Sequence, residues 1–321
     1  MTAKIDWISA VQGTAILMVV IGHCWLISDC RLWYFCYGVH MPLFMFVSGG
    51  LFYMTRISRN WIWGDVVADK LQRLGIPYVV FIIFAYLLKI ALSTKIKNPV
   101  GLSIEDFLLG FVYPMRSAMK EMWFVAALLW LMILYPLWKW ILTQSWLIVA
   151  ALIVFAVLSI VNKPYTGGGI FNILGALKYG IFFYCGMLSF KYKSKWEKLG
   201  WWWGLILIVI YAVVCVWFRQ AQLPIALVGI GGVVLLMRCL TKRYPHILGA
   251  FRDYSMQIFL LGIYPQMFVE IFFRNMASIW WHQVLIFALS VSLGIAFPVF
   301  VAKFAGRLNN RCLNLILGLR G

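Results

Sequence analysis

The stretch VQGTAILMVVIGHCW, residues 11–25, decides the fold class and raises the first functional question. It is almost entirely apolar, yet it carries an imidazole at His23. A polar side chain inside an apolar membrane segment costs free energy, and where one persists a functional role is the default hypothesis. We therefore expect a spanning helix that carries a functional histidine.

The composition of the whole chain is that of a polytopic membrane protein. Hydrophobic residues make up 64% of the 321 residues and charged residues only 12%, whereas a soluble protein carries about 25% charged residues. Phe, Trp and Tyr contribute 17%, which suits aromatic belts at the two membrane interfaces.

The formal net charge of +18 does not indicate nucleic-acid binding. Lysines and arginines stand between apolar segments, where they orient a membrane protein and meet anionic lipids. No aromatic and basic motif of the RNA-binding kind accompanies them. The expected partners therefore include membrane lipids and no nucleic acid.

About ten segments are apolar and long enough, at roughly 20 residues, to span a membrane. They predict an all-α polytopic fold, with residues 1–321 as one integral-membrane domain and no separate soluble domain. Most lysines and arginines fall in the loops that are cytoplasmic if the N-terminus is, so both termini are predicted to be cytoplasmic. The segments are residues 9–28, 33–54, 75–93, 122–142, 145–162, 170–189, 201–218, 223–241, 254–273 and 279–304.

The seven cysteines do not indicate a metal site, because their number is odd and no CxxC spacing occurs. We expect most of them to be small packing residues. Cys30 and Cys36 flank one short loop, and a disulfide between them is the alternative if that loop faces an oxidising compartment.

Two other polar residues, Gln12 and His40, are expected to lie on the same side as His23 or at a similar depth. Gln12 lies 11 residues earlier, about three helical turns, so both side chains point the same way, roughly 16 Å apart along the axis. His40, in the next segment, falls at a similar depth, and the two imidazoles can share a cavity. Imidazole suits general acid–base catalysis. The alternatives are a structural histidine that bonds a neighbouring helix for His23, and an interface residue for His40.

Several segments carry a family resemblance. DWISAVQGTAILMVVIGH resembles the first helix of the membrane acyltransferase type 3 family, in which a basic residue and Gly precede an apolar run that ends in Gly-His. HMPLFMFVSGGLFYM resembles the second helix, and KLQRLGIPYVVF, residues 70–81, resembles the start of the third. Similar segments follow in family order over almost the whole chain, namely EMWFVAALLWLMILYPL, IFFYCGMLSF and YSMQIFLLGIYP.

The resemblance implies an integral-membrane O-acyltransferase of the bacterial cytoplasmic (inner) membrane. Such enzymes take an acyl group, usually acetyl, from cytoplasmic acyl-CoA. They pass it to a hydroxyl of a carbohydrate, often a lipid-linked glycan. The resemblance also implies that His23 is the general base and that a basic residue of the first helix meets the CoA phosphates. Acyl-CoA is then the donor substrate, and the cysteine pattern gives no reason to expect a metal.

Two positions depart from the family pattern. The basic residue of the first helix falls on Gln12, which can hydrogen-bond a phosphate but carries no charge. Either Lys70 or Arg73, near the cytoplasmic mouth in this topology, supplies that charge, or donor binding is altered; a positive-inside anchor is the other reading of both residues. A histidine of the ninth helix falls on Gly262, so its role is absent or moved.

Four further side chains are candidates for the site. Lys178 is costly in the middle of a span, and it either binds a donor or acceptor group in a cavity or pairs with an acid or a carbonyl. Glu121, Trp123 and Glu270 lie near the outer ends of their segments and are candidates for binding the acceptor. A place in the membrane belt is the alternative for Trp123.

The predicted function is direct acyl transfer with His23 as the base. A proton-coupled transporter or flippase of a glycan or small solute is the rival class, since buried histidines and Lys178 would suit it. Few carboxylates lie in the middle of the expected segments, which argues against transport. A family member that binds substrate without chemistry is the third reading, and Gln12 and Gly262 motivate it.

Overall fold

The computed structural model describes residues 6–28, 30–92, 103–162, 168–218, 223–277 and 279–319. Every regular element in these ranges is a helix, which agrees with the all-α prediction. The chain forms two compact units. Unit 1 comprises Met1–Val47 and Tyr192–Leu308, and unit 2 comprises Ser48–Lys191 and Asn309–Gly321. The single-domain organisation stays a prediction.

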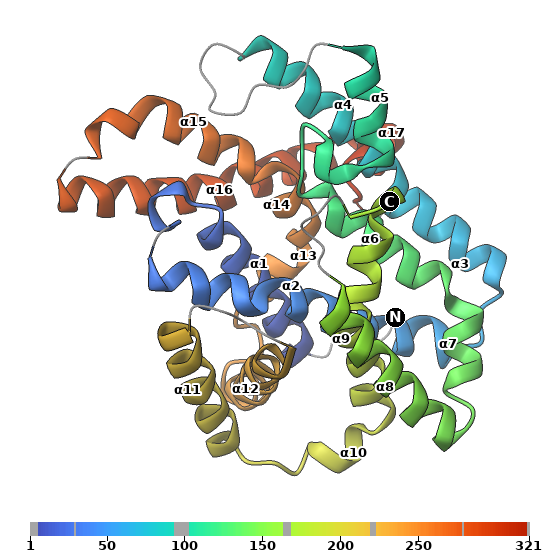
Figure 1. Cartoon of the computed structure of the whole chain (residues 1–321). Helices are drawn as coiled ribbons and strands as arrows, with labels where there is room; N and C mark the ends of the chain where they lie inside the picture. The colour runs from blue at the N-terminus through green and yellow to red at the C-terminus, as the bar shows by residue number, and fades with distance from the viewer. Residues whose placement is uncertain are drawn as a thin grey trace. The chain divides into compact units, whose positions relative to one another are not determined.

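Unit 1 is built around the N-terminal helix α1, which packs against α12, α13, α14 and α16. Val11, Ala15 and Ile16 of α1 are fully buried, as expected for a helix that is apolar on all sides. The elements of unit 1 (Figure 1) are α1 (Asp6–Gly22), η1 (Trp25–Ile27), the first part of α2 (Arg31–Phe52), α10 (Lys193–Trp196), α11 (Trp201–Phe218), α12 (Leu223–Arg243), α13 (Gly249–Asp253), α14 (Ser255–Leu261), α15 (Ile263–Phe273), η6 (Arg274–Met276) and α16 (Trp280–Leu308).

Unit 2 is organised by α9, which packs against α6 and α8. The ring of Trp138 is fully buried there and stacks on Tyr184 of α9. The elements of unit 2 are η2 (Tyr53–Ile57), α3 (Trp63–Lys70), η3 (Leu71–Gly75), α4 (Ile76–Ala91), α5 (Ile104–Val112), η4 (Pro114–Arg116), α6 (Met122–Ile133), α7 (Tyr135–Ile141), α8 (Ser145–Val161), η5 (Ile170–Asn172), α9 (Ile173–Lys191) and α17 (Arg311–Ile316).

Six helices in the described ranges are long and apolar enough to cross a membrane, or up to seven if the bent pair α6–α7 counts as one span. Three shorter apolar helices, α1, α8 and most of α11, coincide with three more of the expected segments. The structure therefore supports a membrane protein with several spans. The number ten and the cytoplasmic termini stay predictions.

The expected segment 122–142 is broken. α6 and α7 meet at an angle of 56°, and Pro136 stands in the first turn of α7. Proline has no N–H to donate to the carbonyl four residues earlier, so the helix cannot continue unbent. The indole N–H of Trp63 donates to the carbonyl of Ile133, next to this break, at 3.0 Å.

The expected segment 75–93 begins earlier than its apolar residues suggest. α3, η3 and α4 form one helical span over Trp63–Ala91, so Lys70 and Arg73 lie within it and not in a loop before it. The η3 turn is π-helical, and Pro77, two residues after it, cannot donate to the carbonyl of Arg73. Wide π-helical turns accommodate interruptions of this kind.

Candidate active site

The C-terminal end of α1 positions His23. The helix ends at Gly22, earlier than the expected residue 28, and the backbone N–H of His23 still donates to the carbonyl of Val19, at 3.0 Å. The side-chain amide of Gln266, in α15, donates to the carbonyl of Val20, at 2.8 Å, and this glutamine is 4% exposed. Two carbonyls of the last turn thus have donors, as a buried helix end requires.

Tyr37 of α2 connects the two candidate catalytic histidines. Its hydroxyl oxygen lies 3.3 Å from Nδ1 of His23. Its ring meets those of His23 and His40 edge-on, with centroids 5.9 Å and 4.7 Å away, and stacks on Trp33 at 4.2 Å. The structure therefore brings His23 and His40 together around one tyrosine.

The hydrogen bonds of the two imidazoles constrain their protonation. Nδ1 of His40 lies 2.9 Å from the carbonyl of Cys36. A carbonyl only accepts, so this nitrogen carries a proton, and in the neutral imidazole Nε2 then carries the lone pair. A phenol can donate or accept, and if it accepts from Nδ1 of His23, then Nε2 of His23 is also basic. Tyr37 is in the position to hold that form.

A second polar group lies at the other end of α1. The amide nitrogen of Gln12 donates to the hydroxyl of Ser255, at 2.9 Å. One turn away, Nη1 of Arg252 donates to the hydroxyl of Ser9, at 2.7 Å, and the same guanidinium pairs with Asp253. Gln12 is therefore tied to the start of α14, with an arginine beside it.

Glu270 and Gly262 belong to the same unit. Glu270 forms an ion pair with Arg274 one turn later. A Cβ at Gly262 would lie 2.8 Å from the carbonyl oxygen of Gly294 in α16. A histidine could not occupy this place without moving a helix, so Gly262 has a packing role.

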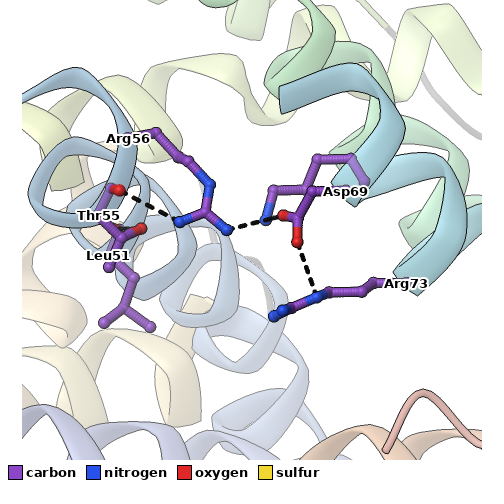
Figure 2. A network of polar contacts seen from close by, with 6 residues as sticks. Leu51, Thr55, Arg56, Asp69 and Arg73 are labelled. Carbon is purple, nitrogen blue, oxygen red and sulfur yellow. Dashed lines mark hydrogen bonds and ion pairs between the residues drawn. The ribbon is translucent and has the colours of Figure 1, made fainter. Parts of the chain in front are cut away.

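Unit 2 holds a cluster of three cations around one carboxylate, which we call the Asp69 cluster (Figure 2). The Asp69 carboxylate lies 2.8 Å from Nη2 of Arg56, 2.8 Å from Nζ of Lys70 and 2.9 Å from Nε of Arg73. The side chains of Arg56, Lys70 and Asp69 are 11%, 13% and 14% exposed, and that of Arg73 is 46% exposed. The cluster keeps an excess of positive charge, which suits an anionic ligand.

An open groove of about 420 Å³ lies at the bend between α6 and α7. Trp61 lines this groove. The guanidinium of Arg56 lies over its ring, 3.8 Å from the centroid, so Trp61 also contacts the Asp69 cluster. The lining residues are Trp61, Trp63, Tyr135, Pro136, Lys139, Trp140 and Thr143.

The remaining predicted residues also lie in unit 2. Trp123 packs on Tyr179, with ring centroids 5.2 Å apart. Glu121 is the residue before α6, two positions from Trp123. Lys178 is half-buried in α9. The predicted residues therefore divide between the units, with Gln12, His23, His40 and Glu270 in unit 1 and Lys70, Arg73, Lys178, Glu121 and Trp123 in unit 2.

Three contributors were not predicted from the sequence. Tyr37 stands three residues before His40, so helical spacing could have placed both on one face. Gln266 is an uncharged polar residue within a span, a signal that is easily passed over. Arg252 lies far from α1 in the sequence, and only folding brings it to Ser9.

Metal chemistry has no evident site in the part of the chain that the structure describes. No group of three or more His, Cys, Asp or Glu side chains there could hold a metal ion. All seven cysteines, including Cys30 and Cys36, are free thiols, so the alternative of a disulfide between those two is not realised.

Comparison with known proteins identifies the family of the chain. A family model described as an acyltransferase domain matches residues 5–302, which includes α1, both histidines and nearly all helices of both units. No curated protein and no solved structure matches the chain. The match covers far more than half of the sequence, and the chain therefore belongs to the acyltransferase type 3 family.

Proposed function

We propose that the protein transfers an acyl group, acetyl in the simplest case, from cytoplasmic acyl-CoA to a hydroxyl of a carbohydrate or lipid-linked glycan. The bacterial cytoplasmic (inner) membrane is the proposed location. Family membership supports membrane acyl transfer in general. The single observation that carries the finer proposal is the contact of His23 with Tyr37, beside the buried His40.

The proposed step is direct transfer. Nε2 of His23 takes the proton of the acceptor hydroxyl while that oxygen attacks the thioester carbonyl. The C–S bond breaks, the CoA thiolate leaves, and the imidazolium returns the proton to it. No acyl-enzyme is needed, because a thiolate is a good leaving group. His40 lies close enough through Tyr37 to share in the proton transfer.

The donor is proposed to bind through its phosphates. In unit 1 it lies along α1, with Gln12 toward the phosphates and His23 toward the thioester. The Asp69 cluster of unit 2, with Lys70 and Arg73, is the alternative phosphate site, and Lys178 is a further candidate in that unit. CoA carries several phosphate groups, so more than one cationic group can take part.

The acceptor is proposed to meet carboxylates and aromatic rings. Glu121 and Glu270 can accept hydrogen bonds from sugar hydroxyls. Trp123, supported by Tyr179, offers an aromatic face to a sugar ring.

The test is release of CoA from acetyl-CoA by the purified protein, with glycolipids extracted from the expressing membrane as the acceptor pool. A general base raises the rate of a reaction by about 10²–10⁴-fold. His23→Ala should therefore lower the rate of CoA release by that factor. His246→Ala is the matched control, since His246 is exposed in a turn and its loss should leave the rate unchanged. Equal rates for the two variants at matched expression would remove His23 from the mechanism.

The rival class is tested on the same samples. A folded wild-type protein that binds no acetyl-CoA, yet supports solute counterflow in liposomes, would be a transporter. Saturable acetyl-CoA binding without CoA release for any acceptor would instead support a family member without chemistry.

A further inference from the structure

The N-terminal half of α1 is joined to the α13–α14 segment by two hydrogen bonds. Ser9 accepts from Arg252 at 2.7 Å, and Gln12 donates to Ser255 at 2.9 Å. Ser9 and Gln12 are three residues apart on α1, which is about one helical turn. Arg252 and Ser255 are also three residues apart, across the break between α13 and α14. Arg252 therefore lies one turn from Gln12 on the same side of α1.

Close packing holds this arrangement in place. A Cβ at Gly13 would lie 2.5 Å from the carbonyl oxygen of Leu248, just before α13. Only glycine at position 13 allows the backbone of α13 to approach so closely. Ser9 and Ser255 are 6% and 8% exposed, so the two hydrogen bonds are sheltered from water. The place of Arg252 is therefore set by the fold.

Arg252 has the capacity for a further ligand. A guanidinium has five N–H groups and keeps its charge under all relevant conditions. Among the described residues, one of these groups serves Ser9 and two serve Asp253. The Arg252 side chain is 21% exposed, and that of Asp253 is 46% exposed. Solvent weakens the hold of such an exposed carboxylate, so an incoming phosphate can compete for the arginine.

We infer that Arg252 supplies the charge that Gln12 lacks and binds a phosphate group of the acyl-CoA donor at this end of α1. The inference rests on the proposed function, because it names a residue of that donor site. The Gln12 amide has a second N–H, which can add a neutral hydrogen bond to the same phosphate. Position 12 then needs no basic side chain, since the cation comes from a different helix.

The experiment removes the positive charge at position 252 and restores one at position 12. Four proteins are compared, namely the wild type, Arg252→Gln, Gln12→Arg and the double variant Arg252→Gln with Gln12→Arg. Binding of CoA and of 3′-dephospho-CoA is measured by calorimetry in detergent, with unfolding temperatures recorded for each protein. Arg243→Gln is the matched control, because Arg243 is an exposed arginine at the end of α12.

The expected result is a specific loss and its rescue. Arg252→Gln should weaken CoA binding at least tenfold, Arg243→Gln should change it less than twofold, and the double variant should recover most of the affinity. If the loss is smaller for 3′-dephospho-CoA, the 3′-phosphate is the group that Arg252 contacts. Arg252→Lys, which keeps the charge, should retain most binding if Arg252→Gln is too unstable to measure.

Different failures have different meanings. A folded wild type that binds no CoA would overturn the proposed function and this inference together. A wild type that binds CoA, with Arg252→Gln equal to it, would overturn the inference alone. A loss in Arg252→Gln that Gln12→Arg does not restore would make Arg252 a structural tie between α1 and α13, which also overturns the inference.

Discussion

Tyr37 is the residue through which the two candidate catalytic histidines are connected. Its hydroxyl reaches Nδ1 of His23, while its ring is held between Trp33 and His40. Aromatic packing fixes the ring whether or not the hydroxyl is present. The hydroxyl therefore favours the tautomer of His23 in which Nδ1 carries the proton. The ring of Tyr37 helps to fix the orientation of the imidazole.

Tyr37→Phe separates these two roles. Loss of one hydrogen bond costs about 1 kcal/mol, so we expect kcat to fall roughly fivefold with little change in the KM for acetyl-CoA. Tyr37→Ala should cost more, because the ring contacts are lost as well. Tyr34→Phe is the control, since Tyr34 packs only edge-on against Trp33 in the contacts described. An unchanged kcat in Tyr37→Phe would show that the hydroxyl does not position His23.

Gln266 supports the end of α1 from a neighbouring helix. Gln266→Leu leaves the carbonyl of Val20 buried without its donor, which costs about 1–3 kcal/mol. We expect a lower unfolding temperature and a lower kcat, because Val20 stands three residues before His23, in the last turn of α1. Gln283→Leu provides the comparison, since its amide donates to the carbonyl of Ala277 at an exposed place. Equal effects of the two substitutions would argue against a special role for the buried hydrogen bond.

At the scale of elements, the contact of α2 with α9 in unit 2 depends on one glycine. A Cβ at Gly49 would overlap the backbone carbonyl of Phe183, and a helix backbone cannot move aside as a side chain does. The Ser-Gly-Gly run at residues 48–50 therefore serves helix packing, as small residues do in membrane proteins. This explains the run without a nucleophilic role for Ser48.

Gly49→Ala should destabilise the protein by about 1–3 kcal/mol through overpacking. Gly64→Ala is the matched control, because nothing lies within 4 Å of a Cβ at that helical position. The control should stabilise the protein slightly, since glycine inside a helix costs about 0.5–1 kcal/mol relative to alanine. Unfolding temperatures in one detergent would separate the two. If Gly49→Ala unfolds at the temperature of the wild type, the close approach of α2 and α9 is wrong.

At the scale of the whole molecule, the predicted topology places the loop after α1 outside the cell and the C-terminal segment inside. Cys30 and Cys312 are exposed free thiols in these two places. In single-cysteine variants, a membrane-impermeant maleimide should label Cys30 in intact cells. Cys312 should react only after permeabilisation. The reverse pattern would show the opposite topology. Most of the loop lysines and arginines would then lie outside, against the positive-inside rule.

The sequence predicted more of the fold than of the site. Apolar length is a local property, so each expected segment overlaps at least one helix in the described ranges. The sequence predicts a loop before residue 75, with Lys70 and Arg73 in it, whereas the structure has one helical span over Trp63–Ala91. In the folded chain the Asp69 carboxylate pairs with Lys70, Arg73 and Arg56, and the helix continues through these residues.

By itself, the sequence determined that the protein is an all-helical membrane protein of the acyltransferase type 3 family with a functional candidate at His23. Hydrophobicity and ordered local motifs suffice for that, since neither needs the partners of a residue. It took the folded structure to show that Tyr37 and Gln266 support the end of α1, that the backbone of Gly294 excludes a histidine at position 262, and that Arg252 stands beside Gln12. These are contacts between residues far apart in the chain, and packing alone selects them.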